Sequence, residues 1–194
     1  MTRTFIALDL HASLQRFLGE VIRQGSAALS TVSWVNPASI HLTLAFLGEL
    51  SDEQLAQARQ ATEAASQQLS PFEYRLSRLG TFGSPRQPRV IWMGIDEPTG
   101  SLVQLHRVLQ RGLELPGFEV DRRPLAAHLT LARIKSPLSP DQLQSLQHFL
   151  QTVQVPSSLP PQAVTQVNVM KSELSRSGAR YTCLWAYTLG GQKA

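Results

Sequence analysis

The sequence predicts an α+β fold with two pseudo-symmetric lobes, in which two antiparallel sheets face each other across a central cleft and helices cover their outer sides. The first observation is a repeated pentapeptide, because HLTLA occupies both 41–45 and 128–132, which lie 87 residues apart. The second is that the same offset aligns five predicted elements of the first half with five of the second, as an internal repeat does. We therefore expect one domain with lobes at about 1–84 and 88–175, followed by an extra C-terminal strand at 180–189.

In the first half, runs of β-forming residues alternate with apolar residues at helical spacing. Ser51 and Gln54 have the spacing of a capping box, which predicts the start of a helix. The elements expected in this half are a strand at 4–10, a helix that includes 14–22, a short strand at 32–35, a turn at Pro37, a motif strand from 40 to 47 that ends at Gly48, a helix from 51 to about 69, and a strand at 72–79.

The second half follows the same order. Leu102, Leu105 and Leu109 recur at helical spacing, and Ser139 with Pro140 is a typical helix start. The elements expected here are a loop at 80–88, a strand at 89–95, a helix at 101–113, an extended piece at 118–120, the second motif strand at 125–134, a helix at 139–150, a Pro-rich loop at 155–162, and strands at 164–171 and 180–189 joined by a loop at 172–178.

Composition restricts the protein's class. No apolar run approaches the roughly 18 residues that a membrane-spanning helix needs, and the N-terminus lacks a signal peptide's apolar core, so we expect a cytoplasmic protein with no membrane partner. The only cysteine, Cys183, excludes a disulfide framework and is expected to be a small buried apolar residue. Lysine and arginine exceed aspartate and glutamate by four, which favours anionic partners such as nucleic acid.

The repeated motif places two kinds of polar side chain on one face of each strand. Residues i and i+2 of a strand point the same way, so His41 and Thr43 share a face, and His128 and Thr130 share the corresponding face of the second strand. The opposite faces are expected to carry Leu42, Leu44 and Phe46 in the first motif and Leu129 and Leu131 in the second. If the halves are related by a pseudo-twofold axis, two imidazoles and two hydroxyls meet in one cleft.

Such a site suits phosphodiester chemistry. Imidazoles with a pKa of about 6.5 form an acid–base pair at neutral pH, and threonine hydroxyls donate hydrogen bonds to phosphate oxygens. Two other interpretations of the motif remain at this point. In one interpretation, each His-x-Thr is a hydrogen-bonded structural pair. In the other, it supplies ligands to a metal ion. A metal would need further ligands, and neither HLTLA stretch contains an acidic residue, so no metal and no cofactor are expected.

Around these motifs the sequence resembles a known family. Paired H-x-T motifs in a bilobal repeat resemble the 2H phosphoesterase superfamily. The stretches FIALDL, WVNPASIHLTLAFLGEL, PRVIWMGI, RRPLAAHLTLARIK and KSELSRSGARYT resemble its bacterial and archaeal RNA 2′,3′-cyclic phosphodiesterases, also called 2′-5′ RNA ligases. The resemblance runs from about Thr4 to Leu189. It departs from the family pattern at Ala127, where the family often has proline.

The resemblance implies roles for the motif residues. His41 and His128 would be the catalytic pair, with His41 as the acid and His128 as the base. Thr43 and Thr130 would bind the phosphate. The family pattern also implies that Arg133 faces the phosphate, whereas strict alternation puts it on the leucine side. Further candidates for lining the site are Ser172, Arg89 and Trp92. The other histidines, His11, His106 and His148, are expected to be non-catalytic.

The expected function is metal-independent hydrolysis of RNA 2′,3′-cyclic phosphate ends to 2′-phosphate ends, with reversible 2′-5′ ligation also implied by the resemblance. The expected partner is RNA with such ends, and the expected oligomeric state is a monomer. Two alternatives stay open. One is a related enzyme acting on a small cyclic nucleotide or an ADP-ribose cyclic phosphate. The other is an RNA-end-binding protein without turnover.

Overall fold

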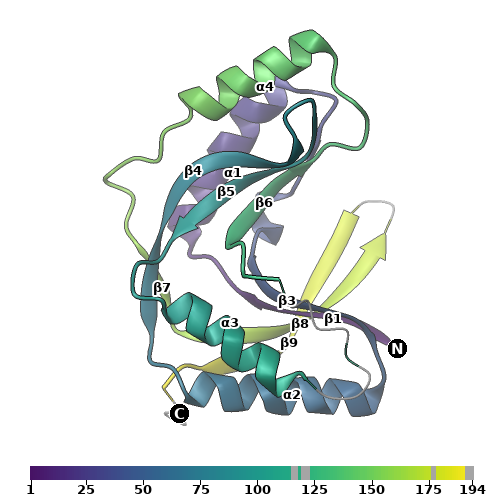
Figure 1. Cartoon of the computed structure of the whole chain (residues 1–194), viewed down its shortest axis with the longest axis vertical. Helices are drawn as coiled ribbons and strands as arrows, with labels where there is room; N and C mark the ends of the chain where they lie inside the picture. The colour runs from purple at the N-terminus through teal and green to yellow at the C-terminus, as the bar shows by residue number, and fades with distance from the viewer. Residues whose placement is uncertain (115–117, 119–122, 176–177, 191–194) are drawn as a thin grey trace.

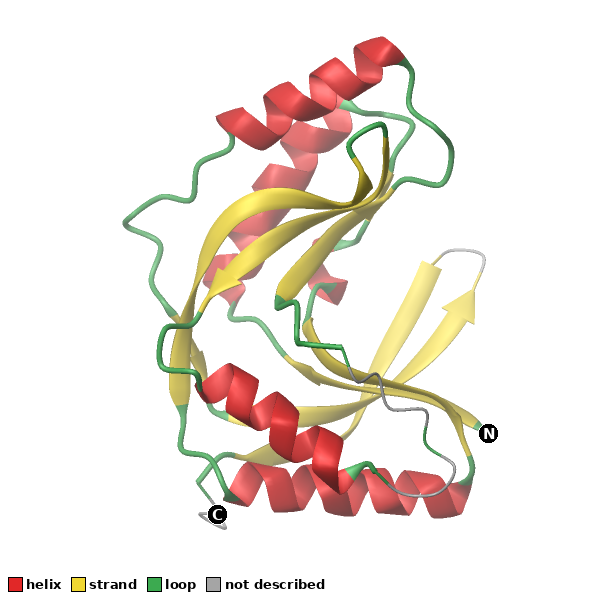
Figure 2. Ribbon diagram, in the orientation of Figure 1, coloured by secondary structure: helices red, strands yellow, loops and turns green. Residues whose placement is uncertain are grey.

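A computed structural model describes residues 1–114, 118, 123–175 and 178–190 of the chain. It has a curled antiparallel sheet with helices packed on its outer side (Figures 1 and 2), which confirms the predicted α+β class. In the described ranges, no helix combines the length and the apolar character needed to cross a membrane.

The helices and strands follow the predicted order closely. The helices are α1 (Ala12–Ala28), the 3₁₀ turn η1 (Pro37–Ser39), α2 (Asp52–Gln67), α3 (Ser101–Gly112) and α4 (Pro140–Thr152). The strands are β1 (Thr2–Leu8), β2 (Ser33–Trp34), β3 (Leu42–Leu50), β4 (Phe72–Ser84), β5 (Gln87–Asp96), β6 (His128–Arg133), β7 (Gln162–Val164), β8 (Gln166–Ser175) and β9 (Gly178–Thr188). The capping box of Ser51 and Gln54 is confirmed at the start of α2.

The sheet consists of two half-sheets that meet at the two motif strands. Its order is β7-β4-β5-β6-β3-β1-β8-β9, with β2 beside β6. The pair that joins the half-sheets is Leu42 of β3 with Leu129 of β6. Both leucines are fully buried, so the seam lies in the hydrophobic core, and the residues on either side of each leucine face the opposite way, into the cleft.

Helices cover the outer side of each half-sheet. Helix α2 contacts β1, β3, β8 and β9, and α3 packs against α2 and β3. Helices α1 and α4 contact each other and lie over the other half-sheet, as Figure 1 shows. The main core therefore fills the space between sheet and helices and leaves the concave side of the sheet free for the cleft.

The spatial lobes differ from the contiguous segments 1–84 and 88–175. Strand β4, which ends the first half of the repeat, pairs with β5 of the second half, and β8 of the second half pairs with β1 of the first. Helix α1 likewise packs against α4. The pairing of β4 with β5 follows from the short connection at residues 85–86, because strands joined by so tight a turn pair as a hairpin.

Several predicted boundaries were wrong. The loop expected at 80–88 is a hairpin, since β4 reaches Ser84 and β5 begins at Gln87. The loop expected at 172–178 is also mostly strand, because β8 reaches Ser175 and β9 begins at Gly178. Strand β3 does not end at Gly48, whose positive φ of 72° accompanies a shift in the pairing with β1. The extended piece expected at 118–120 lies mainly outside the described residues. Cys183 is exposed on β9, contrary to prediction.

Candidate active site

The seam between the half-sheets brings the two motifs together. Because Leu42 and Leu129 are paired in an antiparallel bridge, their neighbours are also opposed across the strands: His41 lies on the side of Thr130, and Thr43 on the side of His128. All four side chains are half-buried. The fold thus positions the two imidazoles and two hydroxyls at the centre of the concave side.

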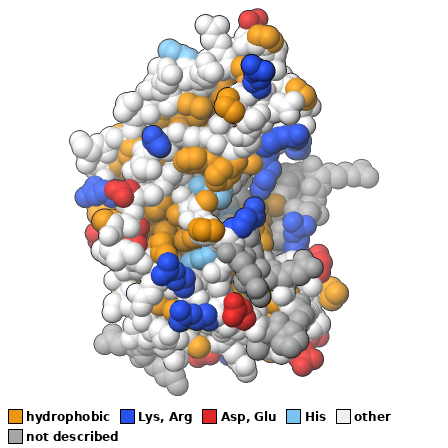
Figure 3. Space-filling model, in the orientation of Figure 1, with side chains coloured by type: hydrophobic (Ala, Val, Ile, Leu, Met, Phe, Trp, Pro, Cys, Tyr) orange, Lys and Arg blue, Asp and Glu red, His pale blue; other side chains and the backbone are white. Residues whose placement is uncertain are grey.

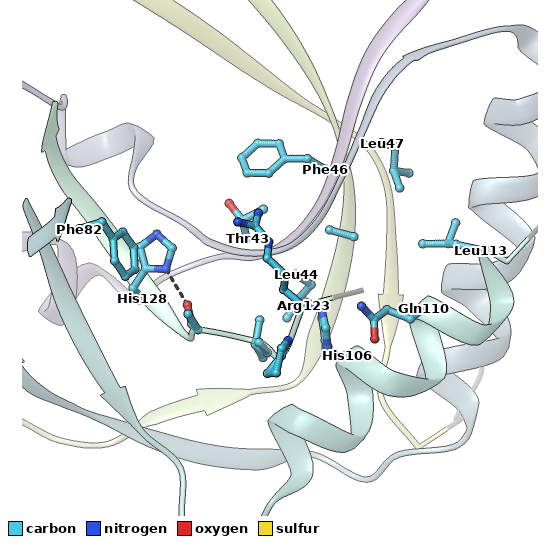
Figure 4. Close-up of a pocket in the computed structure, with 14 residues that line it drawn as sticks. Thr43, Leu44, Phe46, Leu47, Phe82, His106, Gln110, Leu113, Arg123 and His128 are labelled. Atoms are coloured by element: carbon cyan, nitrogen blue, oxygen red, sulfur yellow. Dashed lines mark hydrogen bonds between the residues drawn. The ribbon is translucent and has the colours of Figure 1, made fainter. Parts of the chain in front are cut away.

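Each histidine is held by a backbone carbonyl two residues upstream. The Nδ1 atom of His41 lies 2.9 Å from the carbonyl oxygen of Ser39, and that of His128 lies 2.6 Å from the carbonyl oxygen of Ala126 (Figure 4). A carbonyl only accepts a hydrogen bond, so Nδ1 carries the proton in both rings. The Nε2 atom of each ring is left to exchange protons with a ligand.

Aromatic rings surround both histidines. The ring of His41 lies 4.7 Å from Phe5 and 4.9 Å, edge-on, from Tyr181. The ring of His128 lies 4.8 Å, edge-on, from Phe82. Burial lowers the pKa of His41 below its ordinary value, while the hydrogen bond to the Ser39 carbonyl and the charge of Asp9 act in the opposite direction.

A β-bulge decides where Arg133 points. In β6, Thr130 pairs with Trp92 and Ala132 pairs with Ile91, so Leu131 is an extra residue without a partner on β5. The bulge shifts the alternation by one, and Arg133 returns to the face of His128 and Thr130. Strict alternation, which placed Arg133 on the leucine side, was therefore wrong for this residue.

The first motif carries the same bulge at the equivalent position. In β3, Thr43 pairs with Ala7 and Ala45 pairs with Ile6, which leaves Leu44 as the extra residue. Phe46 then pairs with Phe5 on the cleft face, and its side chain is 64% exposed. The expectation that Phe46 shares the buried leucine face was wrong. Leu44 and Leu131 are separated by the repeat offset, as are Phe46 and Arg133.

A cavity of about 490 Å³ opens beside His128. Figure 4 shows that β3 contributes Thr43 to Leu47 to its wall, that α3 contributes His106 and Gln110, and that Leu113 follows directly after α3. Figure 3 shows hydrophobic side chains over the centre of this face of the molecule, with lysine and arginine side chains around them. The cavity thus joins the polar motif residues to an apolar recess.

The remaining candidates from the sequence lie at different places. Trp92 is opposite Thr130, and Ser172 is opposite Tyr181, the residue that touches His41. Arg89 instead lines a separate small cavity with Ser136. Of the histidines expected to be non-catalytic, His106 lines the cavity beside His128, His11 precedes α1, and His148 is exposed on α4.

Sequence reasoning missed Phe5, Phe82 and Tyr181, the aromatic neighbours of the two histidines. One signal was present: the repeat offset maps Phe5 onto Trp92, which had been singled out. Phe82 lay in an expected loop, and the contact of Tyr181 depends on the pairing of β8 with β9, so neither had a local signal. Within the described part of the chain, no three side chains of His, Cys, Asp or Glu gather as metal ligands.

Comparison with known proteins was made at the level of sequence and fold. The family model described as "LigT like Phosphoesterase" matches residues 13–92 and again 94–181, once in each half of the repeat. The RNA 2′,3′-cyclic phosphodiesterase of Methanothermobacter thermautotrophicus is 30% identical over 190 residues, which cover 96% of this chain and 98% of that protein. That of Geobacillus stearothermophilus is 34% identical over 73% of this chain and 46% of its own length.

Solved structures show the same fold. A protein of Thermus thermophilus superposes with a TM-score of 0.75 at 26% identity, covering 98% of this chain and 100% of that one. LigT of Escherichia coli in apo form gives a TM-score of 0.72 at 27% identity, covering 97% of each chain. The same protein complexed with 3′-AMP gives a TM-score of 0.70 at 28% identity, covering 97% of this chain and 98% of that one.

Proposed function

The chain belongs to the LigT-like phosphoesterase family, and from this premise we propose that it hydrolyses RNA 2′,3′-cyclic phosphate ends to 2′-phosphate ends. The observation that carries the proposal is the pair of histidines at the seam, each with Nδ1–H held by a carbonyl and Nε2 left for proton transfer. Relatives named RNA 2′,3′-cyclic phosphodiesterase support the choice of substrate.

The two histidines divide the proton transfers. His128 removes a proton from water as the water oxygen attacks phosphorus, and His41 donates a proton to the departing O3′ of the ribose. The bond between phosphorus and O3′ breaks, and the phosphate remains on O2′. Each such proton transfer contributes about 10²–10⁴ in rate. Water and leaving group lie on opposite sides of phosphorus, which matches two imidazoles contributed by opposed strands.

Three side chains would hold the phosphate. The hydroxyls of Thr43 and Thr130 are on the same faces as the histidines, and the bulge in β6 brings Arg133 to the face of Thr130. Hydroxyl and guanidinium groups donate hydrogen bonds to the non-bridging oxygens, whose charge grows as water attacks. No metal ion is needed for this mechanism, because proton transfer and charge stabilisation both come from side chains.

The acid role of His41 depends on bound substrate. Burial favours the neutral imidazole in the free protein, since it lowers the pKa of His41. A phosphodiester anion bound beside the ring raises that pKa, because a negative charge stabilises the imidazolium. His41 would therefore become protonated as the substrate binds. In ligation a ribose 5′-hydroxyl takes the place of water in the same step: its oxygen attacks the phosphorus of the cyclic phosphate, O3′ leaves, and the product is a 2′-5′ linkage.

The test is hydrolysis of a defined oligonucleotide with a 2′,3′-cyclic phosphate end in the presence of EDTA. We expect full activity and a product that co-migrates with a 2′-phosphate standard. A 3′-phosphate product would contradict the assigned geometry, and activity that needs an added divalent ion would contradict metal independence. Turnover confined to cyclic mononucleotides or ADP-ribose cyclic phosphate would favour a small-molecule enzyme, and binding without turnover an RNA-end-binding protein.

A further inference from the structure

We propose that the cavity beside His128 is a purine-binding subsite that takes the terminal base of the RNA, with Phe46 as its stacking platform. This inference rests on the proposed function, because it assigns the part of the same substrate that lies next to the cyclic phosphate. The difference between Phe46 and Arg133, which occupy equivalent positions of the repeat, also makes the two sides of the active site chemically different.

The unequal feature is the pair formed by Phe46 and Arg133. Both residues follow the bulge of their motif strand at the same repeat position, so both are turned onto the cleft face. One is an aromatic ring and the other a cation. The repeated histidines and threonines do not by themselves give a pseudo-twofold site a direction. The ring on one side and the guanidinium on the other give it a direction.

The cavity has the size and the surface of a base pocket. Its volume of about 490 Å³ lies within the range of small-molecule sites, and Leu44, Leu47 and Leu113 form an apolar wall. Phe46 borders this wall from the cleft face of β3 and is 64% exposed, although aromatic rings gain free energy when covered. A nucleobase supplies a flat ring that can cover it, while the ribose reaches back to Thr43 and His128.

The polar groups of the cavity favour a purine. Gln110 of α3 and Arg123 both line it (Figure 4). Glutamine and arginine are the side chains that pair with two atoms of a purine edge, glutamine with adenine and arginine with guanine. His106, which is 7% exposed, lies on the same side of the cavity and adds a third polar group. Pyrimidines offer a smaller ring to Phe46 and lack the N7 acceptor.

The experiment compares five oligonucleotide 2′,3′-cyclic phosphates that differ only in the terminal residue: adenosine, guanosine, cytidine, uridine, or an abasic ribose. The variants are Phe46→Ala and Gln110→Ala, and the matched control is Gln104→Ala, an exposed glutamine on the same helix. Binding of adenosine 2′-monophosphate and of base-free ribose phosphate is measured in parallel by calorimetry, so that the subsite is also tested without turnover.

For the wild-type protein we expect kcat/KM to be roughly tenfold higher on purine ends than on the abasic end, in line with the value of one stacked base. Phe46→Ala should remove most of this difference by raising KM on the purine ends, with a much smaller effect on the abasic end. Gln110→Ala should reduce the preference for adenosine, and Gln104→Ala should have no effect. In calorimetry, Phe46→Ala should weaken the binding of adenosine 2′-monophosphate and leave the binding of ribose phosphate unchanged.

Two results would overturn the inference: equal wild-type rates on purine and abasic ends, or an equal loss on both ends in Phe46→Ala. Failure of the proposed function looks different, because the wild-type protein would then hydrolyse none of the five oligonucleotides. In that case the calorimetric comparison tests the subsite. A purine subsite would still bind adenosine 2′-monophosphate more tightly than ribose phosphate, and Phe46→Ala would remove that difference in affinity. No difference there would reject the subsite as well.

Discussion

A backbone carbonyl, and not a carboxylate, accepts the Nδ1–H hydrogen bond of each motif histidine. The carbonyls of Ser39 and Ala126 fix the tautomer and the orientation of the rings without adding a negative charge. A full negative charge in that position would favour the imidazolium form of the ring. A neutral acceptor leaves both rings able to gain and lose protons. The proposed mechanism requires this, because the acid of the forward reaction is the base of the reverse reaction.

His41→Ala and His128→Ala should each lower kcat by about 10²–10⁴, because each removes one of the two proton transfers. Both rings are half-buried at the cleft and outside the main core, so the melting temperature should change little. Steady-state kinetics and thermal unfolding measure the two effects. Near wild-type turnover in either variant would exclude a mechanism with two imidazoles.

Asp9→Asn should shift the alkaline limb of the pH–rate profile to lower pH. The charge of Asp9 raises the pKa of His41, and the amide of Asn168 holds that carboxylate at 2.6 Å. Removing the charge lowers the pKa of His41 further, so the protonated acid is lost at a lower pH. Asp141→Asn, at an exposed position on α4, is the control. A limb that stays in place or moves upward would show that His41 is not the acid or that Asp9 does not act on it.

At the scale of elements, the bulges in β3 and β6 determine which side chains enter the site. The repeat, the order of elements along the chain and the shared faces of His and Thr could be predicted because they follow from periodicity, which the sequence displays. The bulges could not, since Leu44 and Leu131 are ordinary leucines, each between a threonine and an alanine, with no glycine or proline beside them. Their effect appears only in the pairing with β1 and β5, where one residue has no partner. For the same reason, strict alternation placed Phe46 and Arg133 on the wrong face, whereas the family resemblance had implied that Arg133 faces the phosphate.

Arg133→Ala should lower kcat/KM by about 10–100-fold, since a hydrogen bond to a charged group contributes about 1.5–3 kcal/mol. The bulge presents the guanidinium on the face of Thr130, where the phosphate would bind. Arg107→Ala, an exposed arginine of α3, controls for net charge. Kinetics at several salt concentrations make the comparison. An equal effect of the two substitutions would mean that Arg133 acts only through the overall charge of the protein.

At the scale of the whole molecule, the exchange of elements between the halves of the repeat ties the lobes together. Each half-sheet contains a strand from the other half of the chain: β4 pairs with β5, and β8 pairs with β1. The offset of 87 residues reveals the repeat but not the exchange, because the pairing of β4 with β5 depends on a turn that sequence reasoning took for a loop. The seam that carries the two His-x-Thr motifs lies where the two exchanged halves meet.

This exchange predicts that the protein unfolds as one unit and that neither half folds alone. The half formed by residues 1–87 contains β4 without β5, and β1 without β8, so edges that are paired in the whole protein would be left open. Three tryptophans report on the two lobes: Trp34 and Trp92 lie in the half-sheet of β6, and Trp185 lies in that of β9.

Tryptophan fluorescence during urea unfolding reports on one lobe at a time in two variants. Trp185→Phe keeps the two tryptophans of the β6 half-sheet, and Trp34→Phe/Trp92→Phe keeps the one of the β9 half-sheet. Both variants should therefore give the same unfolding midpoint. Each variant's stability is first compared with the wild type by circular dichroism, which corrects for the substitutions themselves. A peptide of residues 1–87 should show no cooperative transition. Two separate fluorescence midpoints, or cooperative unfolding of the fragment, would mean that the lobes are independent and that the strand exchange does not couple them.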